Sequence, residues 1–470
     1  MKKLLRSVVV IITFCLGAHA NTGVQNIIGV VYIPDANFKA ELVNNAVINT
    51  NGDSEIQFSE AMAYNGKILV ANKNISDLTG IEAFMNIYWL DCHGNSLTNL
   101  NVITLSKLRE LHCYDNAITS LNLANNPVLT RLNCANNQLT GLNLSNKQSL
   151  KSVYCGTNKL SSLTIAASPN IQVLDCSVNE LTMLDVFGIP GLIDLYCDNN
   201  QLETLNLSNN SNLKKLHCGA NELTYLNVYV TPALINLHCD NNQIETLNLT
   251  NNSNLKTLHC DNNLMTAIDV SANLKLTELL CHNNYSLAAI DVSVNTDLLK
   301  FQCSNTAVTS LDLSNNAKLE LVYADNTAKL TSLNVANGAN HLIVGGGTHF
   351  NISNAPKLTC VQVDDASYSS TNWTNKDAQT SYSTNCSSLS VNDLDFANTL
   401  VIYPNPTQSD LFFKSETDIE QVTVLSLTGV QIAEYIIDDN KIDVSNLPQG
   451  VYVLSISTDT DNIIRRFVKQ

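Results

Sequence analysis

Apolar and polar positions repeat along most of this chain with a period of 21 residues. A cysteine recurs at that interval ten times: Cys92, Cys113, Cys134, Cys155, Cys176, Cys197, Cys218, Cys239, Cys260 and Cys281. Leu or Val stands two residues before each of these cysteines, Ile or Leu five residues before, and Asn three residues after. Columns that stay in phase over so many periods predict a repeat protein, in which the apolar face of each repeat is covered by its neighbours.

Each repeat contains a short segment in which apolar and polar residues alternate up to the cysteine. Such alternation predicts a strand, and stacked repeats place these strands side by side in parallel. A coil of 21 residues has no room for a long helix as well, so we expect the segments 205–208 and 247–250 to form a second extended edge. The predicted fold is a β-rich solenoid of about thirteen coils, roughly 60 Å long at a strand separation of ~4.8 Å.

The Asn that follows each strand has two amide donors and an acceptor, so it can satisfy backbone groups where the chain leaves the strand. Read in one line, the spacing is L-x-x-L-x-L-x-x-N-x-L, as in Leu108, Leu111, Cys113, Asn116 and Ile118. On these residues the chain resembles the leucine-rich-repeat family, with cysteine in place of the third leucine. The resemblance spans residues 87–358 and implies a solenoid that acts as an interaction module.

The cysteine column extends to Cys303, which follows at an interval of 22 residues. Eleven cysteines cannot all pair, and neighbours in a parallel stack point the same way, which is a poor geometry for a disulfide. We interpret the column as free thiols that pack as small hydrophobic side chains, with metal or redox chemistry as the alternative. Cys360 and Cys386 lie outside the column, in a segment at 359–390 that we interpret as a C-terminal cap. In an exported chain this pair predicts a disulfide that closes the end of the solenoid.

Residues 1–20 have the features of a secretory signal peptide. Three basic residues precede an apolar stretch at 8–16, and an Ala-His-Ala sequence ends at Ala20. Cys15 raises the alternative of a lipoprotein, but Phe14 is bulky where a lipid attachment signal has a small residue. The sequence therefore predicts export.

The hydropathy and the net charge of the chain limit the kinds of partner that we expect it to bind. No later apolar run is long enough to span a bilayer, so we expect the exported chain not to be membrane-spanning. Loss of the three cations of the signal peptide takes the formal net charge from −16 to −19. An acidic chain of this kind binds nucleic acid poorly, which leaves protein or glycan at the cell surface as expected partners.

The segment before the repeats, 21–86, is expected to form an N-terminal cap with a short helix at 34–45. Within it, the segment 49–60 resembles the calcium loop of the EF-hand family. That resemblance implies calcium as a candidate cofactor, with these oxygen ligands: Asn49, Asn51, Asp53, Glu55 through its carbonyl, and Glu60. The loop begins with Asn where Asp is usual, and Ser54 replaces the usual Gly. The alternative is an Asn/Gly turn followed by a helix that begins near Ser59.

The C-terminal segment, 391–470, again has a different pattern, and a stretch rich in Ser, Asn and Asp leads into it. Short alternating strands separated by turn residues are predicted at 400–403, 411–414, 421–426, 432–437, 451–457 and 463–468. This pattern favours a small antiparallel β-sandwich.

The same segment contains three motifs rich in Pro and Gly and a basic end. They are Tyr403-Pro404-Asn405-Pro406, Leu427-Thr428-Gly429, Leu447-Pro448-Gln449-Gly450-Val451-Tyr452, and Arg465, Arg466 and Lys469. On these residues the segment resembles the C-terminal sorting domain of type IX secretion. The resemblance implies transport across the outer membrane of Bacteroidota-type bacteria by the type IX machinery, and a protein that is secreted or held at the outer surface. A sandwich with a purely structural role is the alternative.

Polar and aromatic residues occupy the outward positions next to the cysteines. Six of the eight histidines that follow the signal peptide stand directly before or after a column cysteine. The stack is expected to bring together one group of outward residues: Tyr196, His217, His238, His259, Asp198, Asp240 and Asp261. Three interpretations stay open: a solvated ladder that follows from repeat duplication, a patch that binds protein or glycan, and a zinc site or catalytic His/Asp pair.

The sequence carries no recognisable catalytic signature: it has no G-x-S-x-G, no H-E-x-x-H and no phosphate-cradling loop. We therefore expect a non-enzymatic protein, a secreted or surface-displayed leucine-rich-repeat protein whose solenoid binds protein and serves in adhesion. A glycan-capturing surface protein is the alternative, and a divergent hydrolase that uses the His/Asp patch is a further one.

Overall fold

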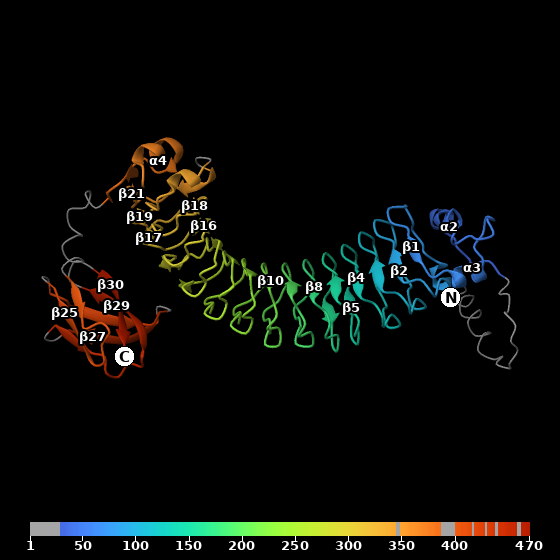
Figure 1. Cartoon of the computed structure of the whole chain (residues 1–470), viewed down its shortest axis with the longest axis horizontal. Coiled ribbons are helices and arrows are strands. Elements are labelled where there is room, and N and C mark those ends of the chain that lie inside the picture. Colours follow the sequence, from blue (N-terminus) through green and yellow to red (C-terminus); the bar gives the residue numbers. More distant parts are fainter. Residues whose placement is uncertain are drawn as a thin grey trace.

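The computed structural model describes residues 29–344, 348–386, 400–415, 418–427, 430–437, 440–457 and 462–470. The predicted signal peptide and the Ser/Asn/Asp-rich stretch that follows Cys386 lie outside these residues. The repeats stack into a curved rod, which Figure 1 shows as an arc of coils that runs from β1 to β21.

One parallel sheet of fifteen short strands runs through the solenoid and lines the inner side of the arc (Figure 1). Its strands are, in order, β1 (Lys67–Leu69), β2 (Trp89–Asp91), β3 (Glu110–His112), β4 (Arg131–Asn133), β6 (Ser152–Tyr154), β8 (Val173–Asp175), β9 (Asp194–Tyr196), β10 (Lys215–His217), β11 (Asn236–His238), β12 (Thr257–His259), β14 (Glu278–Leu280), β16 (Lys300–Gln302), β18 (Leu321–Tyr323), β20 (Phe350–Ile352) and β22 (Asn375–Lys376). The strands pair in register, so the buried leucines of neighbours lie side by side, as Leu216 and Leu237 do. Thirteen of the strands, β2 to β20, fall within 87–358, which matches the expected number of coils and confirms the predicted β-rich solenoid.

Shorter parallel sheets lie on the outer side of the arc. They pair β5 (Gly141–Asn143) with β7 (Ser162–Thr164), β13 (Ile268–Asp269) with β15 (Ile290–Asp291), and β17 (Ser310–Asp312) with β19 (Ser332–Asn334), β21 (Cys360–Gln362) and β23 (Ser381–Ser383). Figure 1 shows β17 and β19 outside β16 and β18. The second extended edge therefore exists, but only in parts of the solenoid.

The predicted strands at 205–208 and 247–250 are wrong. These segments alternate between buried and exposed residues, yet they form no strand. Outer segments with a similar alternation pair in other coils, as β5 and β7 do, so the alternation alone does not determine backbone pairing on the outer side. A buried Asn also bridges the coils there: Asn210 Nδ2 donates to the carbonyls of Val186 (3.1 Å) and Ile189 (3.0 Å).

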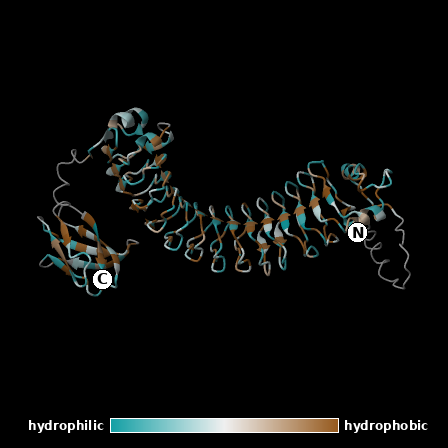
Figure 2. Ribbon diagram, in the orientation of Figure 1, coloured by the Kyte–Doolittle hydropathy of each residue, from teal (hydrophilic) through white to brown (hydrophobic). Residues whose placement is uncertain are grey.

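The core of the solenoid consists of the leucine, valine and isoleucine columns together with the cysteines. All eleven column cysteines are free thiols, and each is at most 1% exposed. Figure 2 shows hydrophobic and hydrophilic residues alternating along the coils. The cysteine column thus packs inside the rod, where it contributes apolar volume.

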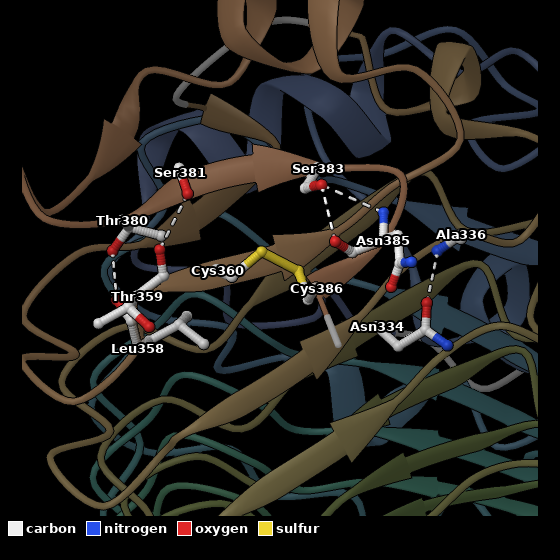
Figure 3. The surroundings of a disulfide bond; sticks show 10 residues. All are labelled: Asn334, Ala336, Leu358, Thr359, Cys360, Thr380, Ser381, Ser383, Asn385 and Cys386. Atoms are coloured by element: carbon white, nitrogen blue, oxygen red, sulfur yellow. Dashed lines mark hydrogen bonds between the residues drawn. A yellow bond between two sulfur atoms is a disulfide. The ribbon is translucent and has the colours of Figure 1, made fainter. Parts of the chain in front are cut away.

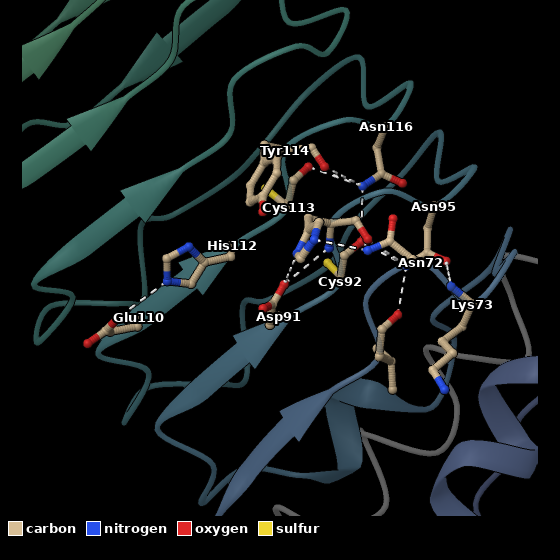
Figure 4. A network of polar contacts seen from close by, with 12 residues as sticks. Asn72, Lys73, Asp91, Cys92, Asn95, Glu110, His112, Cys113, Tyr114 and Asn116 are labelled. Atoms are coloured by element: carbon tan, nitrogen blue, oxygen red, sulfur yellow. Dashed lines mark hydrogen bonds and ion pairs between the residues drawn. The ribbon is translucent and has the colours of Figure 1, made fainter.

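The Asn column holds adjacent coils together through the backbone, as predicted. Asn116 Nδ2 donates to the carbonyls of Cys92 (3.1 Å) and Cys113 (3.2 Å), and its Oδ1 accepts from the amide of Leu97 (2.9 Å). Asn95 makes the same kind of contacts one coil earlier (Figure 4). Each Asn therefore satisfies buried backbone groups of its own coil and of the coil before it.

Helices close the two ends of the solenoid. The N-terminal cap has α2 (Ala36–Val43), α3 (Phe58–Ala63) and the 3-10 turn η1 (Ile81–Ala83); the far end has η2 (Asn340–Leu342) and α4 (Ala366–Asn372). Asp35 caps α2 by accepting from the amides at 37 and 38, and Phe38 and Leu42 are buried. The short helical N-terminal cap is confirmed. No helix among the described residues is long and apolar enough to cross a membrane.

The C-terminal part forms two antiparallel sheets. One orders β24 (Val401–Tyr403), β25 (Asp410–Lys414) and β28 (Lys441–Asp443); the other orders β27 (Gln431–Ile436), β26 (Gln421–Leu425), β29 (Gly450–Ser457) and β30 (Asn462–Lys469). Leu411 and Phe413 of the first sheet share one buried cluster with Val422, Leu454 and Phe467 of the second. The predicted sandwich is confirmed, and β28 is the strand that the sequence pattern missed.

Candidate interaction surface

The large sheet presents its outward side chains in straight rows. The leucine and the cysteine of each strand point into the core, so the residues directly before and after the cysteine face outward. In-register pairing places His217 beside His238, and His238 beside His259. The sequence thus positions equivalent residues of neighbouring coils next to one another.

Four of these residues form a continuous row of rings, which we call the imidazole ladder: Tyr196, His217, His238 and His259. The rings of His217 and His238 stack with centroids 4.0 Å apart and planes at 14°. His238 and His259 stack in the same way, at 4.0 Å and 15°. Tyr196 meets His217 edge to face at 4.8 Å. At the other end, His259 Nε2 lies 3.1 Å from Glu278 Oε1.

Burial keeps the centre of the ladder neutral. The pKa of His238 falls to about 4, because burial disfavours the charged ring and the neighbouring His259 and His217 add repulsion. The pKa of His217 is also lowered, chiefly by burial. At neutral pH these two imidazoles therefore offer uncharged ring edges to a partner.

A depression of about 340 Å³ lies beside the ladder, lined by Asp198, Asn199, His217, Gly219, Ala220, His238, Asp240 and Asn241. Gly219 leaves this space open, since a Cβ there would lie 2.8 Å from Asp240 Oδ1. The structure therefore brings four of the predicted residues, Asp198, His217, His238 and Asp240, to one hollow.

Asp261 behaves differently from the other two predicted aspartates. It is only 7% exposed, and its Oδ2 lies 3.3 Å from His282 Nε2. Burial raises the pKa of Asp261 even though His282 opposes the shift. Asp261 is thus buried and paired with His282, and it does not line the depression.

A second aromatic group, which the sequence reasoning did not single out, lies on the same face near the N-terminal end. Trp89 stacks on His112 at 5.4 Å, with Lys67 Nζ 4.2 Å from the Trp89 ring, and His93 stacks on Tyr114 at 4.2 Å. Figure 4 shows His112 near Glu110, and Tyr114 above Asp91. Trp89 stands three residues before Cys92, an outward position, so the same column reading would have found it.

The metal and catalytic interpretations of the ladder gain no support from its geometry. The described residues contain no group of three or more His, Cys, Asp or Glu that could hold a metal ion. Stacked rings turn their nitrogens in parallel rather than toward one point, whereas zinc needs converging ligands. Burial also raises the pKa of each column thiol, in Cys134 to about 12, so these cysteines do not supply a thiolate nucleophile.

The predicted calcium loop is held by hydrogen bonds among its own residues. Both oxygens of Glu60 accept hydrogen bonds: Oε1 from the amides of Thr50 (2.7 Å) and Asn51 (3.1 Å), and Oε2 from the amide of Gln57 (3.0 Å). Asp53 accepts from the Glu55 amide at 2.8 Å.

Two more of the predicted ligands accept hydrogen bonds within the loop. Asn49 Oδ1 accepts from the Gly52 amide at 3.0 Å, and Asn51 Oδ1 accepts from the Asp53 amide at 2.9 Å. The side-chain oxygens of Asn49, Asn51, Asp53 and Glu60 thus already stabilise the turn and the start of α3, and calcium binding stays a prediction.

Replacing Glu60 by Gln is expected to lower the free energy of unfolding by about 2 kcal/mol, because the buried Glu60 carboxylate that accepts from three backbone amides is lost. Burial raises the pKa of Glu60, but the hydrogen bonds from Gln57, Asn51 and Thr50 outweigh it and lower the pKa overall. This stability is therefore present above the ordinary carboxyl pKa of ~4.3 and is lost as the pH falls below it. Urea unfolding at neutral and acidic pH measures both effects.

Glu55→Gln is the matched control, because it removes only a partly exposed ion pair and is expected to change stability by less than ~1 kcal/mol. Equal losses in the two variants would contradict the structural role of Glu60. A rise in unfolding temperature with calcium that disappears in Glu60→Gln would support the calcium loop.

The structure joins Cys360 of β21 to Cys386 by a disulfide, next to β23 (Figure 3). Nearby, Trp373 stacks on Phe350 at 4.1 Å and donates from Nε1 to the carbonyl of Ile343 at 3.2 Å. The last coil is therefore closed by a disulfide and by a stacked pair of aromatic rings.

The motifs of the C-terminal part converge on its last strand. Asn405 Nδ2 donates to the carbonyl of Arg466 (3.1 Å), and its Oδ1 accepts from the amide of Val468 (2.9 Å). The Tyr452 hydroxyl donates to the Pro448 carbonyl at 2.8 Å. Thr428 and Gly429 of the second motif lie outside the described residues.

Comparisons with known proteins agree with both parts of the chain. Residues 401–470 match the family model described as secretion system C-terminal sorting domain. Among solved structures, the functional domain of InlJ from Listeria monocytogenes, which includes a cysteine ladder, is 24% identical with a TM-score of 0.56, over 93% of this chain and 96% of that chain. The internalin InlF from Listeria monocytogenes is 20% identical with a TM-score of 0.54, over 71% of this chain and 96% of that chain. None of the curated proteins matches.

At these identities the structural likeness establishes the fold, and the sorting domain indicates export by type IX secretion to the cell surface or beyond. The chain therefore has a leucine-rich-repeat fold and carries a secretion system C-terminal sorting domain at residues 401–470.

Proposed function

We propose that this protein is an adhesion protein, secreted or held at the outer surface, and that it binds another protein through the inner face of its solenoid. The observation that carries the proposal is the imidazole ladder, a row of four rings on a rigid sheet beside an open depression. Rings that are already stacked lose little conformational freedom when a partner binds, which favours their use as contacts.

The stacking also favours a protein over a glycan as the partner. His217, His238 and His259 cover one another's faces, so the flat surfaces on which a sugar ring would stack are already occupied. Their edges stay available, and the ring nitrogens on them can donate or accept hydrogen bonds. A polar, irregular protein surface can use such edges.

In the proposed organisation, the other parts of the chain export the solenoid or close its ends. A signal peptide at 1–20 is removed on export, caps at 21–86 and 359–390 close the solenoid at 87–358, and 391–470 addresses the chain to the type IX machinery. The sequence features described above support these boundaries. The solenoid is then the part that works outside the cell.

Changing Tyr196, His217 and His238 together to Ala is expected to weaken partner binding at least tenfold, because three adjacent anchors of about 1 kcal/mol or more each are lost. The measurement is binding of the full chain to proteins from the surroundings of the producing cell, by capture followed by quantification of each captured protein. The matched control is Tyr225→Ala with Tyr229→Ala, which removes two exposed rings outside the large sheet. Equal binding by the two variants would refute the role of the ladder.

A further inference from the structure

Charge is divided across the inner face of the solenoid. In every coil from Cys92 to Ile352, the residue directly before the column position and the two directly after it are never Lys or Arg. Seven of these positions are aspartates, which we call the acidic edge: Asp91, Asp115, Asp175, Asp198, Asp240, Asp261 and Asp325. The positions three and four before the column residue carry seven cations instead: Arg109, Arg131, Lys151, Lys214, Lys215, Lys256 and Lys300.

The two sides also differ in how their charges are paired. On the basic side, Lys215 lies 3.8 Å from Asp194 and Lys300 lies 3.3 Å from Glu278. On the acidic edge, the ion pairs found among the described residues involve only histidine, as in Asp261 with His282. Among the described residues, no aspartate of the acidic edge forms an ion pair with lysine or arginine.

The depression beside the ladder lies on this edge. Asp198 and Asp240 flank it from coils on either side of Gly219. Their hydrogen-bond donors are neutral amides: Asn199 donates to Asp198 at 2.9 Å, and Asn241 donates to Asp240 at 2.7 Å. With neutral imidazoles along its inner wall, the hollow carries two negative charges and no positive one at neutral pH.

We propose that the acidic edge binds an extended basic segment of a partner protein, with one lysine or arginine side chain seated between Asp198 and Asp240. The inference rests on the proposed function and adds the chemical class of the partner. Charge complementarity is its physical basis, since a partner of like charge would be repelled. From Asp175 to Asp261 the edge spans four coil intervals, ~19 Å at ~4.8 Å each, which fits about six residues of extended chain.

The test uses the full chain and an oligolysine peptide of about ten residues, with oligoglutamate of equal length as a probe of opposite charge. Asp198→Asn with Asp240→Asn removes both carboxylates and keeps their shape. It is expected to weaken oligolysine binding about tenfold in fluorescence anisotropy, and binding is expected to weaken as salt rises.

Asp291→Asn with Asp312→Asn is the matched control, with the same change in net charge. Both residues accept a turn amide on the outer side, from Ser293 (2.9 Å) and Ser314 (3.0 Å). Asn206 and Asn248 do the same in other coils, so this control keeps the fold. Its oligolysine affinity is expected to stay within about twofold of the unaltered chain.

Equal weakening by both pairs of substitutions, or no binding of oligolysine, would overturn the inference. Binding that calcium abolishes through Asp198 and Asp240 would also overturn it, since a divalent cation would then be the occupant. A captured protein that depends on Tyr196, His217 and His238 but not on Asp198 and Asp240 would leave the proposed function standing while refuting the basic segment. If partner binding depends neither on Tyr196, His217 and His238 nor on Asp198 and Asp240, both the proposed function and the basic segment are refuted.

Discussion

Raising the pH from about 8 to about 10 is expected to unfold the solenoid, because its eleven buried thiols resist ionisation only while the chain is folded. Burial raises the pKa of each of them, in Cys134 to about 12, and neighbouring cysteines of the stack add to the shift in residues such as Cys113. In the unfolded chain the same thiols ionise near ~8.5.

The direction in which stability changes with pH follows from these two pKa values. A group whose pKa is higher in the folded state stabilises the fold fully below the unfolded pKa and loses that contribution as the pH rises toward the folded value. Each cysteine then loses ~1.4 kcal/mol by one pH unit above ~8.5. Over eleven residues the loss is on the order of 10 kcal/mol, comparable to the whole stability of a typical domain, ~5–15 kcal/mol.

Circular dichroism against pH, together with titration by a thiol reagent, measures this transition. Below pH 8 the column thiols are expected not to react, and all of them react once the chain unfolds. Ala324 occupies the cysteine position of its coil and is fully buried, so Cys155, Cys176 and Cys197 can be changed to Ala as a control. The control is expected to show a shallower loss of stability with pH, and an unchanged slope would contradict the explanation.

Replacing Asn137 by Ala is expected to lower the free energy of unfolding by about 3 kcal/mol or more. Asn137 is 3% exposed, and its Nδ2 donates to the carbonyls of Cys113 (3.0 Å) and Cys134 (3.1 Å). Its Oδ1 accepts from the amide of Ile118 at 2.9 Å. Alanine leaves the Ile118 amide without its acceptor, which costs about 1–3 kcal/mol. It also takes one of two side-chain donors from each carbonyl, because Asn116 and Asn158 donate to them as well, and each lost hydrogen bond costs about 1 kcal/mol.

Chemical denaturation of the purified chain measures the loss. Asn212 is exposed in a turn, so Asn212→Ala is the control, with an expected change of about 0.5 kcal/mol or less. Asn137→Thr gives an intermediate case, because Thr306 already fills this column in one coil and donates to the Cys303 carbonyl at 2.7 Å. A loss in Asn137→Ala no larger than in Asn212→Ala would show that the column does not join the coils.

Most features of the solenoid could be predicted from the 21-residue period of the sequence. The position of Leu216 has the same environment in every coil. The column of equivalent residues therefore predicts that Leu216 is buried, that it lies in a strand, and which residue lies beside it in the sheet. The absence of strands at 205–208 was not predictable in this way, because this segment has nearly the same pattern of buried and exposed residues as 142–145, which overlaps the paired strand β5.

The candidate site was predictable as a set of neighbours, but its interactions were not. Column positions placed His217 beside His238, whereas the stacking of their rings depends on side-chain rotation. The pairing of Asp261 with His282 depends on rotation too, and it joins residues of two different coils. The division of charge was visible in the columns, but only the structure shows which columns share an edge.

The uniform register of the large sheet has a consequence for how such a chain can change length. Duplication or deletion of one complete 21-residue unit leaves all other columns aligned, so genetic recombination between repeats yields a longer or shorter protein that still folds. A change by any other number of residues has to be absorbed within one coil, as in the 22-residue interval between Cys281 and Cys303, where Leu279 and Phe301 still pair and Phe301 stays buried. The length of the solenoid can therefore vary in whole steps of one coil, while the ladder keeps its spacing.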